Sequence, residues 1–251
     1  MPTTSPSLRP STTAVGLHDV HKTYPGPEPV HALRGVSLSL PLGSFTAVMG
    51  PSGSGKSTLL NCAAGLDSPT SGQVVIGGRD VSGLSADALT RFRREHVGFV
   101  FQAYNLIAHL SVADNIELPV VLAGLAPDPA WQAELLDAVG LSGMGQRRPT
   151  ELSGGQAQRV AIARALFAKP TVVFADEPTG ALDSRTGAQV LSVLRAAADR
   201  FSQTVVVVTH DPHVAAAVDS VAFLADGRLV DRVERATPEQ IAATMLSMGG
   251  A

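Results

Sequence analysis

The stretch "FTAVMGPSGSGKSTLL", residues 45–60, runs from an apolar segment through a glycine-rich loop into a second apolar segment. Residues 50–57 fit the phosphate-loop pattern G-x-x-x-x-G-K-S/T. The apolar residues before the loop are typical of a buried strand, and "TLLNCAAGL" after it is typical of a helix. The stretch therefore predicts a strand, a phosphate-binding loop and a helix in direct succession.

The residue types in this loop suit phosphate binding. The loop consists of Gly50, Pro51, Ser52, Gly53, Ser54, Gly55, Lys56, Ser57 and Thr58. Glycines let backbone N–H groups turn toward phosphate oxygens, and the helix that begins near Lys56 directs its positive end at the same charge. Lys56 would neutralise the β and γ oxygens of ATP, and the Ser57 hydroxyl can bind Mg²⁺. A turn that merely links strand and helix is the simpler alternative, but the register of strand, lysine and helix favours phosphate binding.

Two adjacent carboxylates end a second apolar run, "TVVFADEPTGALD", residues 171–183. Asp176 at the tip of this predicted strand would help to hold Mg²⁺. Glu177 would point toward the γ-phosphate and polarise the attacking water as a general base. Acids that solvate a strand end or cap a helix are the alternative, and the presence of a phosphate loop argues against it.

Polar side chains also lie at the carboxyl ends of two further apolar runs, which we expect to be strands. His210 ends "TVVVVTH", and Gln102 follows "VGFVF". Ligands of open α/β sheets bind at the carboxyl ends of strands, so His210 is a candidate contact of the γ-phosphate. Gln102 could bind Mg²⁺ or orient water. Because it begins the helical region, it could also transmit the nucleotide state of the site to that region. A lone histidine is more often structural, and only its position favours His210.

A second glycine motif, "LSGGQ", lies at residues 152–156. Ser153, Gly154, Gly155 and Gln156 fit S-x-x-Q, which is also an ordinary helix capping box. The helix behind the motif is apolar on several faces and should be buried, and its glycine-opened N-terminus is a second candidate anion site. The motif ends the helical region and is not expected to reach the phosphate loop of its own chain. Two copies that meet head to tail could each complete the site of the other.

The remaining patterns predict an α/β fold. The predicted fold is a P-loop NTPase core with a mostly parallel sheet, an N-terminal antiparallel β portion and an inserted helical subdomain. Gly77–Gly78 and Asp226–Gly227 are hairpin signals, and Ser111 and Asp128 are candidate helix starts. Residues 1–14 are expected to form a disordered tail, and residues 15–251 a single domain. Its core comprises residues 15–84, with the antiparallel portion, and 160–251, and the helical insert spans about 85–159.

The composition limits the possible functions. The chain has 251 residues, a net charge of −3 and a single cysteine, Cys62. No overall positive field would attract nucleic acid, and no disulfide framework or cysteine-rich metal site is expected. The apolar windows are shorter than the ~20 residues that a membrane-spanning helix needs. We therefore expect a soluble, intracellular protein whose membrane contacts come through a partner.

In combination, these motifs resemble the nucleotide-binding subunit of ABC transporters. The resemblance rests on "GPSGSGKST", Gln102, "LSGGQ" with "RVAIARAL", "VVFADEP", "ALD" and His210, in this order. It implies that Ser153 and Gly155 touch the γ-phosphate bound to the opposite protomer. Glu177 would be the general base, His210 the γ-phosphate sensor, and Asp183 a link between the two sites.

The resemblance also implies an aromatic contact and a branch of the family. Tyr24 in "HKTYPG" falls where the family stacks a ring on adenine, although a half-exposed strand tyrosine is the alternative. "GLDSPTSG" and "ADEPTGALD" resemble the branch that serves lipoprotein-releasing and macrolide-export permeases. The implied cofactors are ATP and Mg²⁺, and the implied partners are a second copy of the chain and a separately encoded integral membrane permease. The chain would then be peripheral, at the cytoplasmic face of the cell membrane.

Two other functions remain open from the sequence. A cell-division-type regulatory ATPase would use the same residues without transporting a substrate. A soluble ABC-type ATPase that acts on nucleic acid or the ribosome would typically show coiled-coil arms, zinc cysteines or two cassettes, and none is evident here. The transported substrate is not encoded in the motifs.

Overall fold

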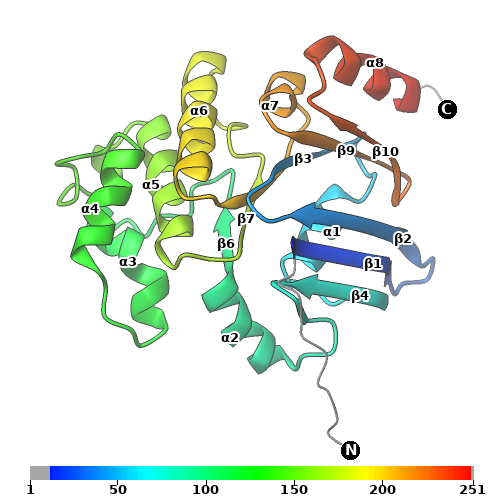
Figure 1. Ribbon diagram of the computed structural model, residues 1–251, viewed down its shortest axis with the longest axis horizontal. Coiled ribbons are helices and arrows are strands. Elements are labelled where there is room, and N and C mark those ends of the chain that lie inside the picture. Colours follow the sequence, from blue (N-terminus) through cyan, green and yellow to red (C-terminus); the bar gives the residue numbers. More distant parts are fainter. Residues whose placement is uncertain (1–11, 250–251) are drawn as a thin grey trace, which may run out of the picture.

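A six-stranded sheet forms the centre of the computed structural model, which describes residues 12–249. The strand order is β10-β9-β3-β8-β7-β6, and all neighbours are parallel except β10 and β9. The strands are β3 (Phe45–Met49), β6 (Val97–Val100), β7 (Val172–Asp176), β8 (Thr204–Val208), β9 (Ser220–Ala225) and β10 (Arg228–Glu234). The predicted mostly parallel α/β sheet is confirmed (Figure 1).

The central strands are buried on both faces, which explains their continuous apolar sequences. In β8, Val205 and Val207 belong to one hydrophobic core, and Val206 and Val208 belong to another. Successive side chains of a strand point to opposite faces, so a single valine run supplies both cores. The carboxyl ends of β3, β7 and β8 therefore meet at one edge of a rigid sheet.

A separate four-stranded antiparallel sheet, in the order β2-β1-β4-β5, carries the N-terminal part of the fold. Its strands are β1 (Thr13–Tyr24), β2 (Val30–Pro41), β4 (Ser71–Ile76) and β5 (Arg79–Asp80). The predicted tail over residues 1–14 is wrong at its end, because β1 begins at Thr13 and Ala14 is buried among apolar neighbours. The rest of the tail prediction, residues 1–11, lies outside the described part of the chain.

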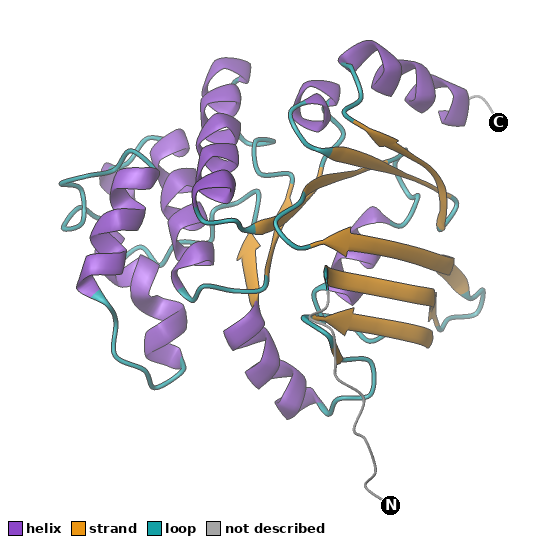
Figure 2. Ribbon diagram, in the orientation of Figure 1, coloured by secondary structure: helices purple, strands orange, loops and turns teal. Residues whose placement is uncertain are grey.

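The helices cover both faces of the central sheet (Figure 2). They are α1 (Lys56–Ala63), α2 (Ala86–His96), α3 (Val112–Leu122), α4 (Pro129–Ala138), α5 (Gly154–Phe167), α6 (Ser184–Arg200), α7 (Pro212–Ala216) and α8 (Pro238–Gly249), with a 3-10 turn, η1 (Pro149–Glu151). Figure 1 shows α3, α4 and α5 grouped on one side of the molecule and the antiparallel sheet on the other. Within residues 12–249, no helix is both long and apolar enough to cross a membrane.

The predicted helical insert, residues 85–159, includes one strand that belongs to the core. Strand β6 pairs with β7 from Val97↔Val172 to Val100↔Ala175, so it is part of the central sheet. Gly98 and Val100 are buried, and the strand expected at "VGFVF" is present, although the predicted boundary assigned it to the insert. The predicted boundary is therefore corrected, because the chain re-enters the sheet before the residues that lead to α3.

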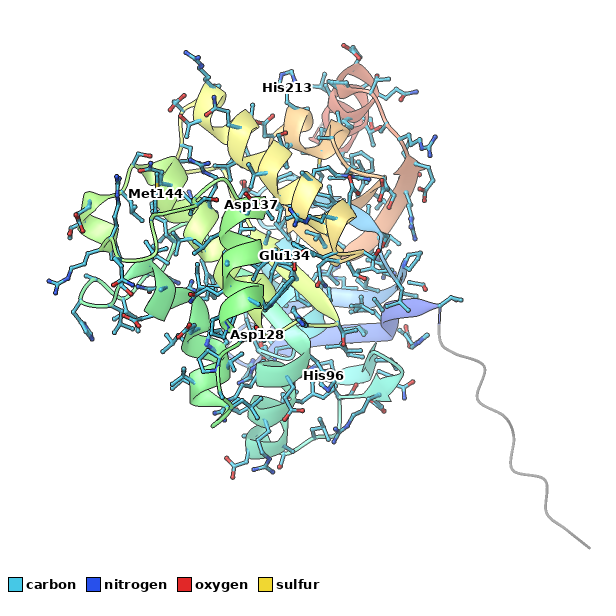
Figure 3. All side chains as sticks on the ribbon, turned by 60° about the vertical axis from the view of Figure 1, so that its left-hand side comes forward. His96, Asp128, Glu134, Asp137, Met144 and His213 are labelled. Carbon is cyan, nitrogen blue, oxygen red and sulfur yellow. The ribbon has the colours of Figure 1, made fainter. Side chains whose placement is uncertain are left out.

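The predicted starts of α3 and α4 are confirmed. The Ser111 hydroxyl accepts from Asp114 N at 3.1 Å, and Asp114 Oδ2 accepts from Ser111 N at 3.2 Å, which is a complete capping box. Asp128 Oδ1 accepts from the first backbone N–H groups of α4. Glu134 and Asp137 lie on the same helix (Figure 3). Both pair with Arg200 of α6 and connect the insert to the core.

Candidate functional site

The phosphate loop joins β3 to α1, as predicted. Gly55 is the N-cap of α1 with φ 100°, a left-handed conformation, and a Cβ there would collide with the backbone oxygen of Ala32. Lys56 Nζ donates to Gly50 O at 2.8 Å and to Pro51 O at 2.9 Å. The loop backbone therefore fixes the ammonium at the entrance of the helix, where N–H groups and the helix dipole already favour an anion.

The phosphate loop and the acid pair form one electrostatic cluster. Burial lowers the pKa of Lys56, and the charges of Glu177 and Asp176 partly oppose this shift. Burial, followed by the charge of Glu177, raises the pKa of Asp176, and Lys56 works in the other direction. The structure thus brings the predicted residues of two distant segments into mutual electrostatic contact.

Glu177 is held in a strained and well-anchored position. Its φ is 45°, a left-handed conformation that a non-glycine residue seldom adopts, and its N–H donates to Val208 O at 2.9 Å. The Glu177 carboxylate contacts His210 Nδ1 at 2.8 Å and accepts from the Thr209 hydroxyl at 3.3 Å. Such strain concentrates at functional sites because the surrounding structure must stabilise it. Here the ends of β7 and β8 do so.

Gln102 lies beside Glu177. It is exposed and follows β6 by two residues. A Cβ built on Gly180 would lie 2.9 Å from Gln102 Nε2 and 3.4 Å from Glu177 Cβ, so both side chains pack against the same glycine. The predicted position of Gln102 at the edge of the site therefore agrees with the structure.

The donors predicted for Mg²⁺ fit a site that relies on substrate and water. Ser57, Gln102 and Asp176 offer a hydroxyl, an amide oxygen and a carboxylate, which are hard oxygen ligands. Among residues 12–249, no three histidine, cysteine, aspartate or glutamate side chains converge into a metal site. Mg²⁺ commonly takes one or two carboxylates together with phosphate oxygens and water, so this donor set suits it.

The second glycine motif forms the capped start of α5. Gln156 N donates to the Ser153 hydroxyl at 3.3 Å, and Gln156 Oε1 accepts from Ser153 N at 2.9 Å, so the capping box is present. Gly155 is required by packing, because a Cβ there would lie 2.5 Å from Thr186 Cγ2 of α6. Ser153 and Gly154 are exposed. The start of α5 therefore reaches the surface at Ser153 and Gly154, whereas the Gln156 N–H is already bonded to the Ser153 hydroxyl.

Asp183 lies next to this motif. It caps α6 by accepting from Arg185 N at 3.1 Å and Thr186 N at 3.0 Å. Hydrogen bonds from Thr186, and then from Arg185, lower the pKa of the exposed Asp183 carboxyl. Because Thr186 contacts both Asp183 and Gly155, the "LSGGQ" and "ALD" motifs meet in one place.

The two glycine motifs of one chain remain apart. Figure 1 shows α5 with α3 and α4, whereas α1 lies beside the antiparallel sheet. Among the described residues, no hydrogen bond joins Ser153–Gln156 to the loop of residues 50–58. The arrangement agrees with the prediction that the second motif does not reach the phosphate loop of its own chain.

Tyr24 ends β1 close to the phosphate loop. It is 37% exposed, so the alternative of a half-exposed strand tyrosine describes its burial correctly. Burial raises the pKa of Tyr24, while the nearby Thr58 hydroxyl lowers it. Since Thr58 is the last loop residue, the ring lies at the edge of the candidate site.

One residue of the site was not predicted. Gln158 is fully buried on α5, and its Nε2 donates to Pro178 O at 2.6 Å and to Phe101 O at 3.3 Å. It therefore connects α5 to the segments that follow β6 and β7, which carry Gln102 and Glu177. The available signal was a glutamine among the apolar residues of a buried helix.

Replacing Gln158 by leucine should therefore lower both stability and turnover. The substitution leaves the buried Pro178 carbonyl and the part-buried Phe101 carbonyl without this donor, which should cost about 1–3 kcal/mol of unfolding free energy. Gln203→Leu is the matched control, because this buried amide also donates to a proline carbonyl, Pro170 O at 3.0 Å, but away from the site. Thermal unfolding and ATPase assays should show similar destabilisation in both variants and a lower kcat only for Gln158→Leu. Equal kcat values would refute the connecting role.

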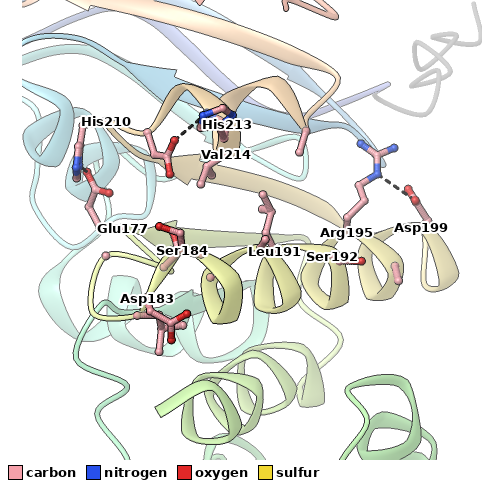
Figure 4. A pocket seen from close by; sticks show the side chains of 18 residues that line it. Glu177, Asp183, Ser184, Leu191, Ser192, Arg195, Asp199, His210, His213 and Val214 are labelled. Carbon is pink, nitrogen blue, oxygen red and sulfur yellow. Dashed lines mark hydrogen bonds and ion pairs between the residues drawn. The ribbon is translucent and has the colours of Figure 1, made fainter. Parts of the chain in front are cut away.

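A cavity of about 900 Å³ opens beside Glu177 and His210 (Figure 4). It runs between α6 and α7 toward the Arg195–Asp199 ion pair, and Asp183 also lines it. No residue of the phosphate loop lines the cavity, so it extends from Glu177 and His210 and is separate from that loop.

Comparison with known proteins agrees with this geometry. The family model described as ABC transporter matches residues 33–180. The macrolide export ATP-binding/permease protein MacB of Salmonella paratyphi A is 48% identical over 222 residues, which cover 87% of this chain and 34% of that protein. The chain thus spans about a third of the length of this relative.

Solved cassettes match along nearly their whole length. The dimeric, post-hydrolysis structure of the ATP-binding cassette MJ0796 bound to ADP and Pi has a TM-score of 0.78 and 42% identity, covering 88% of this chain and 99% of that chain. CbiO1 of Clostridium perfringens, part of the ABC transporter complex CbiONQ, has a TM-score of 0.81 and 26% identity, covering 93% and 92%. The predicted P-loop NTPase architecture is confirmed, and the chain belongs to the ABC transporter family.

Proposed function

We propose that this chain is an ATP-hydrolysing subunit in which two copies close head to tail around two ATP molecules and drive a separate membrane permease. The main support for the proposal is that the phosphate loop and the second glycine motif lie in different parts of one chain. Lys56, Asp176 and Glu177 gather at one edge of the sheet, whereas Ser153 stands exposed at another place. The structure of the MJ0796 cassette, whose similarity covers 88% of this chain, is a dimer bound to ADP and Pi.

Each chain supplies the general base and the phosphate loop of one site, and the second copy completes that site. Glu177 takes the proton of the attacking water as general base, and His210 keeps the carboxylate in place at 2.8 Å and senses the γ-phosphate. Lys56 and the N–H groups of the loop and of α1 neutralise the phosphate oxygens. Catalysis then comes mainly from positioning and charge, because phosphoryl transfer needs little covalent chemistry from the protein.

Other residues complete the site. Ser57, Gln102 and Asp176 would hold Mg²⁺, which when bound supplies further neutralisation of phosphate charge. Tyr24 would stack on the base of the nucleotide. Ser153 to Gln156 of the second copy would bind the γ-phosphate through the start of α5, and Asp183 would connect the two sites.

The permease would dock on the insert, beside the loop after β6. A groove of about 350 Å³ opens there between β6, α3 and α5, lined by Phe101, Asn105 and Leu122 among others. Leu122 is 61% exposed and Leu125 is 62% exposed at the adjacent end of α3. An exposed apolar patch with a groove is typical of a protein interface. Because Gln102 follows Phe101, a nucleotide-dependent movement of this loop would be transmitted to the partner.

Such docking would place the chain peripherally at the cytoplasmic face of the membrane, consistent with its likeness to the macrolide export protein. Export, extraction from the membrane and a cell-division-type regulatory role use the same ATPase. The identity of the permease distinguishes them.

Purification of the chain from membranes tests this proposal. The wild-type chain should bring down an integral membrane permease, and Leu122→Asp should lose it because a charge in an apolar interface is costly to desolvate. Leu246→Asp is the matched control, since Leu246 is 78% exposed on α8, on the opposite side of the molecule in Figure 1. Loss of the permease with both variants or with neither would contradict the proposed docking surface. Binding to nucleic acid at physiological salt in place of a permease would favour the other class of ATPase.

A further inference from the structure

We propose that Asp67 and Lys22 are positioning residues that hold the Tyr24 ring as a platform for the nucleotide base. The inference rests on the proposed function, because it concerns how the same site takes the base of ATP. Neither residue belongs to the phosphate loop or to the second glycine motif. Both act through Tyr24 and would not touch the nucleotide.

The contacts around Tyr24 fix the ring from two directions. The Tyr24 hydroxyl donates to Asp67 Oδ2 at 2.9 Å, and Lys22 Nζ donates to Asp67 Oδ1 at 2.6 Å. The Lys22 ammonium lies 4.9 Å from the centre of the Tyr24 ring, within the range of a cation–π interaction. One carboxylate thus holds both the edge of the ring and the cation that covers one of its faces.

Lys22 is itself well anchored. Its side chain is only 12% exposed, and its ammonium also donates to Ser68 O at 2.8 Å. Since Lys22 covers one face and Tyr24 remains 37% exposed, the exposed part of the ring is available for stacking. Burial alone would raise the pKa of Asp67, but hydrogen bonds from Lys22 and Tyr24 outweigh it and lower the pKa. Asp67 is therefore a carboxylate acceptor at neutral pH.

The segment after α1, which carries Asp67, connects the Tyr24 ring to the phosphate loop. Asp67 follows α1, and the backbone N–H groups of Leu66 and Asp67 both donate to Asn61 O of that helix. Thr70 continues the connection, since its hydroxyl accepts from Thr23 N at 2.9 Å. Helix α1 thus begins at the phosphate loop, and the segment after its end places Asp67 against the Tyr24 ring. The phosphate loop, which would bind the phosphates, and the Tyr24 ring, which would bind the base, would therefore be held at a fixed distance from each other.

A fixed ring should bind a base more tightly than a mobile one, because binding then loses less side-chain entropy. The effect should appear in the affinity for ATP and spare the affinity for a ligand without a base. Inorganic tripolyphosphate is such a ligand. Comparing the two separates the platform from the phosphate loop and from general folding defects.

The test uses the purified full-length chain and measures dissociation constants for Mg·ATP and Mg·tripolyphosphate. Asp67→Ala should weaken ATP about fivefold, the size of one hydrogen bond, and leave tripolyphosphate unchanged. Tyr24→Phe should have the same effect, and the double variant should be no worse than either. Asp67→Asn keeps an acceptor oxygen and should recover most of the affinity. Asp80→Ala is the matched control, because Asp80 accepts from Gln73 Nε2 at 2.7 Å in the same antiparallel sheet.

Each other outcome has a distinct meaning. Equal weakening of ATP and tripolyphosphate by Asp67→Ala would show a merely structural role and overturn the inference. Unchanged ATP affinity in Asp67→Ala would do the same, and so would additive effects of Asp67→Ala and Tyr24→Phe. In these cases the wild-type chain still binds ATP, and the proposed function stands. If the wild-type chain bound neither ligand, the proposed function itself would fail.

Discussion

A Glu177→Gln chain is expected to bind ATP as the wild type does and to hydrolyse it at about one hundredth of the wild-type rate or below. Glutamine has nearly the same shape and retains an acceptor oxygen for the Thr209 and His210 contacts, at 3.3 and 2.8 Å in the wild type. It cannot take a proton from water at neutral pH. The variant should therefore stop at the step before hydrolysis and accumulate as a closed dimer with ATP.

Two measurements check this expectation. Steady-state phosphate release gives kcat, and size-exclusion chromatography with ATP detects the dimer. Glu234→Gln is a suitable control, because Glu234 is an exposed acid on β10 that pairs with Arg232 at 3.3 Å. If Glu177→Gln turned over ATP at the wild-type rate, the assignment of the general base would be wrong.

A Ser153→Arg chain is expected to lose about two orders of magnitude in turnover while it still binds ATP at its own phosphate loop. Loss of anion-stabilising donors at a transition state typically costs this much. The exposed start of α5 would carry a bulky side chain where the second copy presents its nucleotide. The substitution also removes a helix cap, which costs about 1 kcal/mol of stability.

The matched control for this variant is Ser111→Arg. Ser111 caps α3 through the same kind of capping box, so the two variants should lose similar stability. Only Ser153→Arg should lose turnover in a phosphate-release assay at equal protein concentration. A similar loss in both variants would mean that capping, and not contact with nucleotide, explains the effect.

The sequence predicted the fold correctly where a residue pattern favoured a single kind of secondary structure. The continuous apolar runs of β7 and β8 favoured strands buried on both faces, and the loop after β3 combined glycines, a lysine and a helix in a fixed register. The predicted boundary assigned strand β6 to the helical insert, because its partner in the sheet, β7, lies far along the chain. The end of the tail was misplaced by two residues, because burial of Ala14 depends on the packing of two sheets.

Site residues that belong to sequence motifs could be predicted. Residues that connect one motif to another through tertiary contacts could not. Lys56, Asp176 and Glu177 were found from their spacing, and their clustering agrees with the sequence. Gln158 was missed because its partners, two backbone carbonyls, have no sequence signal. Asp67 was missed for a similar reason, since its contact with Tyr24 joins residues 43 positions apart. The roles assigned to these residues remain predictions.

The dependence of turnover on protein concentration tests the shared site most directly. If each site is divided between two copies, the ATPase rate per mole of wild-type chain should rise steeply with concentration, until dimers saturate. Light scattering on the same dilution series should show monomers at the low end. A constant rate per mole down to concentrations where only monomers are present would contradict a site built from two chains.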